Sequence, residues 1–332
     1  MSRRPDPDAL AARLLQGDRR ALARAITLVE SSHPDDRTAA ESLLQAILPA
    51  TGQQDAGRAI RIGISGTPGV GKSSFIERFG LFLTGQGHRV AVLAVDPSSA
   101  LSGGSILGDK TRMEQLVREP AAFIRPTPSG GSLGGVARRT REAMLLVEAA
   151  GFDVVLVETV GVGQSETTVA EMVDIFLLLL APAGGDDLQG IKRGIMELAD
   201  LVIVNKADGE LLPKARLAAA DYRMALHLMR PRHAEWRPQV QLVSALLNEG
   251  IGEVWTAIGQ YREALQKTGA LAAQRRHQAE AWLMRELQDG LLDWLKQEPA
   301  IAGELPRLQK AVGKGQTTPS AAARKLLEML RR

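Results

Sequence analysis

Short apolar runs alternate with helical periodicity through the middle of the chain, residues 58–266. The runs cover residues 60–64, 90–95, 154–157, 175–180, 201–204 and 240–243. Strands that are apolar at nearly every position are buried on both faces, as in a parallel sheet covered by helices. The pattern predicts a doubly wound α/β fold with a mostly parallel sheet, whose ligands bind at the carboxyl ends of the strands.

The first part of the chain, residues 1–57, lacks strand signals and carries three sets of apolar residues at helical spacing. Ser31 to Asp35 forms a break followed by a helix start, and residues 51–57 form a polar linker. We expect a small helical hairpin that packs on the core. A partner-binding surface is the alternative.

The last part, residues 267–332, is predicted to be helical again. A long helix opens after Gly269 and extends to about Lys296, and Pro299 interrupts it. A last helix begins near Pro319. A helical extension beyond a complete α/β core must bury its apolar stripe elsewhere, and a symmetric homodimer is the simplest solution.

Composition narrows the classes of function. The chain is 45% hydrophobic and 24% charged, with a net charge of +3 and 4% aromatic residues, so nucleic acid is not an expected partner. It has no cysteine, which excludes disulfides, thiolate zinc sites and cysteine nucleophiles, and its five histidines show no metal-ligand spacing. No apolar run reaches membrane-spanning length, and Asp6 and Asp8 do not fit a secretory signal. We expect a cytoplasmic protein without a membrane partner.

The first motif with chemical content is G-x-x-x-x-G-K-[ST], the phosphate-binding P-loop, at residues 66–73. It follows a predicted strand and precedes a predicted helix, the context that the motif requires. Its glycines let backbone N–H groups point at phosphate oxygens, Lys72 is expected to reach the β- and γ-phosphates, and the Ser73 hydroxyl to ligate Mg²⁺. The predicted phosphate site comprises Gly66, Thr67, Pro68, Gly69, Val70, Gly71, Lys72, Ser73 and Ser74.

A second motif indicates the base. The run 201–204 leads into N-K-x-D at residues 205–208. The Asp208 carboxylate can accept from guanine N1–H and from the N2 amino group, and adenine offers neither donor. Asn205 can tie this loop to the P-loop, and the stem of Lys206 can cover a face of the base. The later turn Ser244, Ala245 and Leu246 is expected to offer backbone N–H to guanine O6.

Acidic residues follow two of the predicted strands. Asp96 ends one strand and Glu158 another, positions that hold Mg²⁺ in P-loop enzymes, directly or through water. The N–H of Gly161 could bond the γ-phosphate, which would make its loop a switch that relaxes after hydrolysis. No glutamine directly follows Gly161, since Gln164 lies three residues further on.

Taken together, these stretches resemble the MeaB/ArgK-type GTPases, chaperones of adenosylcobalamin-dependent acyl-CoA mutases such as methylmalonyl-CoA mutase. The resemblance covers residues from about 10 to 330. The segments that resemble this family are GTPGVGKSS, VDPSSALSGGSILGDKTRM, TPSGGSLGG, VETVGVGQSE, GGDDLQGIKRGIMELAD and NKAD.

The resemblance implies further roles. Lys72, Asp109, Glu158 and Gly161 would serve hydrolysis, and Ser73, Asp96, Asp109 and Glu158 would lie at the metal and the switches. A third switch loop that senses the nucleotide and contacts the mutase would include Asp186, Asp187, Gln189 and Lys192; without the resemblance, this loop is typical of a solvated turn. Family members dimerise through the C-terminal helical arm.

The leading hypothesis is therefore a homodimeric, Mg²⁺-dependent GTPase that gates delivery of adenosylcobalamin to a mutase. Slow intrinsic turnover is expected, because no glutamine or arginine finger is evident in cis. The runner-up is an ATPase or kinase coupled to basic amino-acid transport, although N-K-x-D argues against ATP. The absence of cysteine and of a His-rich tract argues against a nickel-insertion GTPase. The presence of Lys72, Ser73 and Glu158 argues against a nucleotide-binding module without activity.

Overall fold

A computed structural model describes most of the chain and divides it into two compact units. The described residues are 6–31, 33–51, 59–95, 113–127, 133–159, 165–182 and 193–329. The first unit is Met1–Gln278 and the second is Ala279–Arg332. Among the described helices, none is both long enough and apolar enough to span a bilayer.

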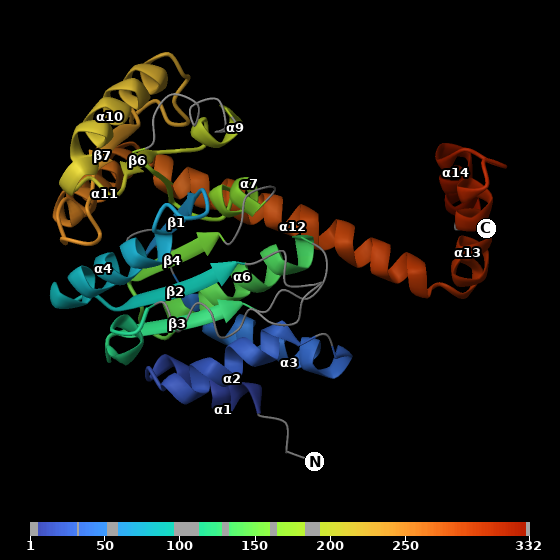
Figure 1. The fold of residues 1–332 in the computed structure, drawn as a ribbon. Coiled ribbons are helices and arrows are strands. Elements are labelled where there is room, and N and C mark those ends of the chain that lie inside the picture. Colours follow the sequence, from blue (N-terminus) through green and yellow to red (C-terminus); the bar gives the residue numbers. More distant parts are fainter. Residues whose placement is uncertain are drawn as a thin grey trace. The chain divides into compact units, whose positions relative to one another are not determined.

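The first unit is built on a seven-stranded sheet with the order β3-β2-β4-β1-β5-β6-β7, in which every strand pair is parallel (Figure 1). Because β1 lies in the middle and the chain then winds to both sides, the sheet is doubly wound, as the sequence predicts. The strands are β1 (Ile60–Gly66), β2 (Val90–Val95), β3 (Ala122–Thr127), β4 (Val154–Thr159), β5 (Ile175–Leu180), β6 (Leu201–Val204) and β7 (Gln239–Leu242).

One strand was not predicted from the apolar pattern. Strand β3 contains Arg125 and Pro126 and lies at the edge of the sheet, beside β2. A proline removes a ladder donor and is tolerated in edge strands, where one side of the strand has no neighbour to pair with. Arg125 and Pro126 interrupt the apolar pattern, so the pattern did not predict β3, although an edge strand tolerates both residues.

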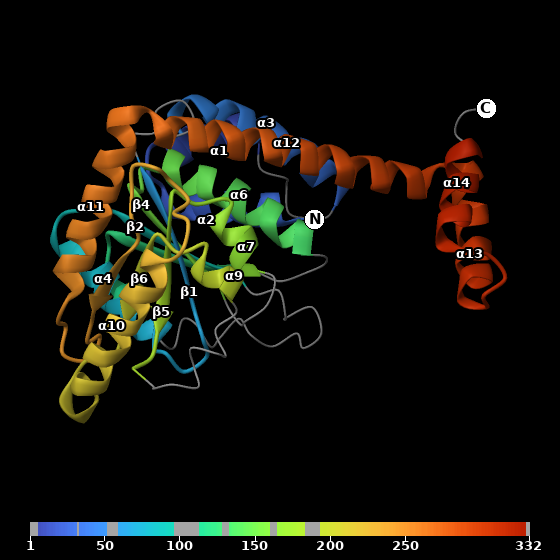
Figure 2. The ribbon, with the colours of Figure 1, turned by 90° about the horizontal axis from the view of Figure 1, so that it is seen from above.

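Helices cover both faces of this sheet (Figures 1 and 2). Helices α4 (Lys72–Gly85) and α11 (Ile251–Thr268) pack on the face that carries Ile62 and Ile64. Helix α10 (Leu212–His227) covers the other face at β5 and β6, and Figure 1 shows β6 and β7 between α10 and α11. Alternate residues of each strand thus enter different cores, which explains why the strands are apolar throughout.

Helix α6 (Leu133–Ala149) also lies on that other face, at β2, β3 and β4, and α7 (Ser165–Ala170) lies there at β1 and β4. Gly63 in β1 allows the close approach of this layer. A Cβ atom at Gly63 would lie 2.9 Å from side-chain atoms of Phe176 and Val173, and 3.0 Å from Val169.

The N-terminal segment contains three helices rather than the expected hairpin. They are α1 (Pro7–Leu15), α2 (Arg19–Glu30) and α3 (Pro34–Ile47), and they pack on one another and on α6. Gly17, with φ +78°, turns the chain, and the Asp18 side chain caps α2, so one apolar stretch becomes two helices. Arg125 of β3 pairs with Glu30 of α2 at 2.6 Å, which ties this segment to the sheet edge.

Buried ion pairs attach the start of α12 (Ala270–Gln297) to the core of the first unit. Arg275 Nη2 lies 2.6 Å from Asp174 Oδ2, with side-chain exposures of 2% and 1%. Burial by itself would raise the pKa of Asp174, but Arg275 together with Arg61 outweighs burial and holds the pKa below its usual range. Arg275 also donates to the Ala59 carbonyl at 2.6 Å, just before β1.

The second unit contains the rest of α12, α13 (Pro299–Gly313) and α14 (Pro319–Met329). Pro299 begins α13, as the sequence predicts, and the Thr318 hydroxyl accepts from the Ala321 N–H at 3.2 Å at the start of α14. Large apolar side chains remain more than half exposed along this part of α12: Leu283, Met284, Leu287, Leu291, Leu292 and Trp294.

The Arg275–Asp174 pair provides the first prediction. Replacing Arg275 with Met leaves a carboxylate buried without its counter-ion, so the free energy of unfolding should fall by about 3–5 kcal/mol, measured by urea denaturation at neutral pH. The loss should shrink as the pH falls, because without Arg275 burial favours the protonated form of Asp174 in the folded variant, so acid relieves the uncompensated charge. The exposed neighbour Arg276 provides the matched control, since Arg276→Met should change stability little. Equal losses in the two variants would contradict a special role for the buried pair.

Candidate nucleotide site

The predicted P-loop lies between β1 and α4, at the carboxyl edge of the sheet. Gly71, with φ +90°, is the N-cap of α4, and Lys72 is the first helical residue. Lys72 Nζ donates to the Gly66 carbonyl oxygen at 2.6 Å, across the loop. The N-terminus of α4 adds positive potential at the same place, so the loop offers both a cation and backbone donors to an anion.

Two of the loop glycines are required by close contacts. A Cβ atom at Gly66 would lie 2.3 Å from the Leu179 carbonyl oxygen of the neighbouring strand β5. At Gly71 it would lie 2.7 Å from Asn205 Nδ2, and the positive φ there independently favours glycine. The glycine spacing of the motif is therefore set by packing against β5 and against the loop after β6.

Asn205 joins three segments of the site. Its Nδ2 donates to the Val70 carbonyl at 2.9 Å, and its Oδ1 accepts from the Ala245 N–H at 3.2 Å. The residue is 1% exposed. The predicted tie between the base loop and the P-loop is thus present, and it extends to the turn after β7. In this structure the Ala245 N–H is directed at Asn205, whereas the sequence analysis assigned this turn to guanine O6.

The other base-loop residues lie beside the P-loop. Lys206 has φ +60° and donates from Nζ to the Gly69 carbonyl at 2.8 Å, so its stem spans the gap between the two loops. The Ser244 hydroxyl donates to Asp208 Oδ2 and accepts from the Leu247 N–H at 3.0 Å. These contacts orient the Asp208 carboxylate, which is partly exposed and open to a ligand.

Two neighbouring residues at the end of β4 face opposite sides of the sheet. Glu158 shares its face with Leu156, which belongs to the core under α4, and it is 3% exposed. Thr159 faces the other side, where its hydroxyl donates to Ser65 Oγ at 2.9 Å. Ser65 and Thr159 are both buried. The pattern of acidic residues at strand ends indicates Glu158 but not the Ser65–Thr159 pair, since only strand register reveals that Ser65 and Thr159 are adjacent.

Several predicted site residues lie outside the described residues: Asp96, Asp109, Gly161, Asp186, Asp187, Gln189 and Lys192. Their roles stay predictions. Within the described ranges no group of three or more His, Cys, Asp or Glu side chains is arranged to hold a metal. The Ser73 hydroxyl at the start of α4 and the Glu158 carboxylate are oxygen donors of the kind that Mg²⁺ prefers, so the residues present fit this ion.

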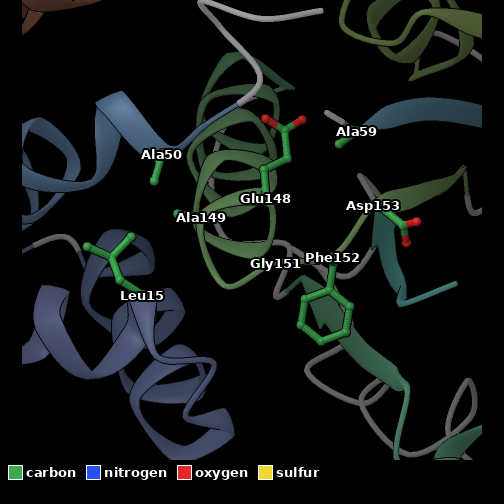
Figure 3. A pocket seen from close by; sticks show the side chains of 8 residues that line it. All are labelled: Leu15, Ala50, Ala59, Glu148, Ala149, Gly151, Phe152 and Asp153. Atoms are coloured by element: carbon green, nitrogen blue, oxygen red, sulfur yellow. The ribbon is translucent and has the colours of Figure 1, made fainter. Parts of the chain in front are cut away.

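A cavity of about 370 Å³ lies at the opposite edge of the sheet (Figure 3). Its lining includes Ala59, which precedes β1, and Asp153, which precedes β4. Its two carboxylates already have partners, because Glu148 pairs with Arg61 at 2.5 Å and Asp153 accepts from the Arg89 N–H at 2.7 Å. The cavity is therefore separate from the P-loop edge, and its carboxylates serve the fold.

Comparison with known proteins identifies the family. The model of the methylmalonyl-CoA mutase-associated GTPase MeaB matches residues 22–300. The chain belongs to the MeaB family of GTPases. It is therefore a GTP-hydrolysing enzyme of the P-loop class, in agreement with the loop geometry described above.

Relatives of the family extend over nearly the whole chain. A putative GTPase of Caulobacter vibrioides is 58% identical, covering 97% of both chains. The mouse methylmalonic aciduria type A homolog, described as mitochondrial, is 50% identical over 97% of this chain and 79% of its own length. The GTPase ArgK of Escherichia coli is 49% identical, covering 96% of this chain and 95% of its own. The crystal structure of a LAO/AO transport system kinase superposes with a TM-score of 0.78 at 41% identity and covers both chains fully.

The base loop yields a prediction about nucleotide choice. Asp208→Asn replaces one acceptor oxygen by a donor, so the amide suits xanthine better than guanine. The ratio of kcat/KM for GTP to that for xanthosine triphosphate should fall by roughly 100-fold or more. Steady-state hydrolysis with both nucleotides measures it. The exposed neighbour Glu210 supplies the control, since Glu210→Gln should keep the GTP preference. An unaltered ratio in Asp208→Asn would show that the base is read elsewhere.

The Ser65–Thr159 pair yields a second prediction. Thr159→Val keeps the shape but leaves the buried Ser65 hydroxyl without this donor, which should cost about 1–3 kcal/mol and displace the end of β4 that carries Glu158. We expect GTP turnover to fall and the Mg²⁺ concentration for half-maximal turnover to rise, while Thr159→Ser restores both.

A second buried threonine gives the control for stability alone. The Thr51 hydroxyl donates to the Leu48 carbonyl at 2.8 Å in the N-terminal segment. Thr51→Val should lower the melting temperature without changing the Mg²⁺ requirement. If Thr159→Val behaved in the same way, the pair would be a feature of the core only.

Proposed function

We propose that this GTPase is a chaperone of an adenosylcobalamin-dependent acyl-CoA mutase such as methylmalonyl-CoA mutase. It would gate loading of the cofactor and protect or reactivate the mutase. Membership of the MeaB family, whose model is described as mutase-associated, carries the proposal. The mouse relative named for methylmalonic aciduria supports the same assignment.

The contacts of the described residues support a proposal for how the nucleotide binds. We propose that Lys72 exchanges its contact with the Gly66 carbonyl for the β- and γ-phosphates, while backbone N–H groups of residues 67–73 surround the phosphate oxygens. Ser73 and Glu158 would hold Mg²⁺, which neutralises charge on the phosphates when it is bound. Asn205, Lys206 and Asp208 would fix the guanine against the P-loop.

The roles of the other predicted residues are also proposed from membership of the MeaB family. Asp96 and Asp109 would complete the metal site, Gly161 would bond the γ-phosphate, and the loop from Asp186 to Lys192 would report the nucleotide state to the mutase. The exposed apolar residues of α12 in the second unit support a homodimer that forms through the C-terminal arm, residues 267–332. We propose a cytoplasmic location and neither a membrane nor a nucleic-acid partner. We also propose that the boundary between the N-terminal helical segment and the GTPase domain lies near residue 57.

A second function has its own support. One relative is named GTPase ArgK, and the LAO/AO transport system kinase shares the fold and 41% of its residues. An activity coupled to basic amino-acid transport is the alternative. The arrangement of Asn205 and Asp208 favours GTP over ATP for either function, so the nucleotide does not distinguish them, whereas the partner does.

The deciding experiment measures hydrolysis of GTP and ATP by the purified protein, alone and with candidate acyl-CoA mutases. We expect slow turnover of GTP, little turnover of ATP, and acceleration by one mutase of up to roughly 10³-fold if that mutase supplies or orders a missing catalytic group. Lys72→Ala should abolish turnover in both conditions while keeping the melting temperature, which shows that the activity belongs to this site. GTP turnover that no mutase changes would favour the transport-linked alternative.

A further inference from the structure

Helix α10 exposes an apolar stripe on the face turned away from the sheet. Its inner face buries Ala215, Ala219 and Tyr222 against β6 and β7. Its outer face exposes Leu217 by 66% and Met224 by 70%, and Leu228, the C-cap residue, by 82%. Three large apolar side chains exposed to this degree on one helix are typical of a surface that meets another protein.

The spacing of the stripe suits a helical partner. Leu217 and Met224 are seven residues apart, and Leu228 follows four residues later. The exposed Ala220 lies between them on the same side of the helix. Residues at these intervals form one continuous row along an α-helix, the arrangement into which the apolar row of a second helix packs.

A row of arginines borders the stripe. Arg216 and Arg223 are exposed and lie seven residues apart on α10, and Arg230 is exposed just beyond the end of this helix. Arg223 donates to the Val240 carbonyl at 3.2 Å. Within the described part of the chain, none of the three arginines forms an ion pair with a carboxylate. Because the exposed Asp221 lies on the opposite side of the stripe, the arginines are available to carboxylates outside this chain on one side of the stripe.

We propose that the outer face of α10 is a docking surface for an acidic amphipathic helix of a partner protein. The apolar row of that helix would cover Leu217, Met224 and Leu228. A row of Glu or Asp residues beside it would pair with the arginines, as charged residues flank the seam of a helical pair. A second copy of α10 is a poorer occupant, because symmetric pairing would bring two arginine rows into one interface.

The surface lies close to the base loop along the chain. The 3-10 turn η4 (Gly209–Leu211) is the only segment between Asp208 and α10. The helix that carries the stripe thus begins one 3-10 turn after the residue proposed to read guanine, and Leu217 follows Asp208 by nine residues. Docking would give the partner of the proposed function access to the nucleotide state, and the identity of that partner as a mutase rests on the proposed function.

A labelled peptide tests the docking chemistry directly on the full chain. The peptide carries Leu at the two seam positions of about three heptads and Glu at the flanking positions, and a matched peptide carries Lys in place of Glu. Fluorescence anisotropy should show binding of the acidic peptide, weakening with salt, and no comparable binding of the basic one. The double variant Leu217→Ser/Met224→Ser and the variant Arg216→Glu should each lower the affinity at least roughly tenfold.

Control variants separate docking from folding. Arg24→Glu changes an exposed arginine on α2 and should leave peptide affinity unchanged. All of these variants should keep basal GTP turnover within about twofold of the wild type, because none of the changed side chains touches the nucleotide loops. Equal binding of both peptides, or unchanged affinity in the Leu217→Ser/Met224→Ser variant, would overturn the proposal.

The mutase assay then tests the partner. With a mutase that accelerates the wild type, the Leu217→Ser/Met224→Ser variant should need roughly tenfold more mutase for half-maximal acceleration. Unchanged acceleration would overturn α10 as the docking surface for that mutase. If no mutase accelerates the wild type while the acidic peptide binds, the proposed function fails and the docking surface stands. A change of oligomeric state in the double variant, seen by sedimentation, would show instead that this face joins two copies of the chain.

Discussion

The nucleotide edge of this protein depends on the hydrogen bonds of one buried amide, that of Asn205. The amide accepts from the turn after β7 and donates to the P-loop, so three loops that are far apart in the sequence form one rigid surface. A parallel sheet makes this possible, because the carboxyl ends of its strands all lie at the same edge. The glycine at position 71 follows from the same contact, since a side chain there would displace the amide.

At the end of β4, the neighbouring residues Glu158 and Thr159 face opposite sides of the sheet and make different contacts. Glu158 faces the α4 side, where the metal is proposed to bind, and Thr159 faces α7 and contacts Ser65 at the base of the P-loop. The two residues cannot move independently, because they are joined by one peptide bond in a buried strand.

Among the described residues, the exposed apolar side chains of α12 and those of α10 differ in the charges that surround them. The α12 residues of the second unit lie among both acidic and basic residues, which suits a contact between copies. The stripe on α10 is bordered by arginines without acidic partners in the described chain, which suits a different protein. The proposed homodimer and the proposed partner would need separate surfaces, and different charges around the two surfaces would keep them from binding each other.

The sequence by itself determined the fold class, six of the seven strands and the chemistry of the two nucleotide motifs. These are local properties: unbroken apolar runs, glycine spacing, and fixed side chains at a strand end. It missed β3, because Pro126 and Arg125 break the apolar pattern of a strand that only the sheet edge tolerates, and it predicted a helical hairpin where the N-terminal segment forms three helices. Only the tertiary structure revealed the Ser65–Thr159 pair, the reach of Asn205 to Ala245 and the exposure of the α10 stripe. Each of these depends on which strands and helices become neighbours, and the spacing of residues along the chain does not contain that information.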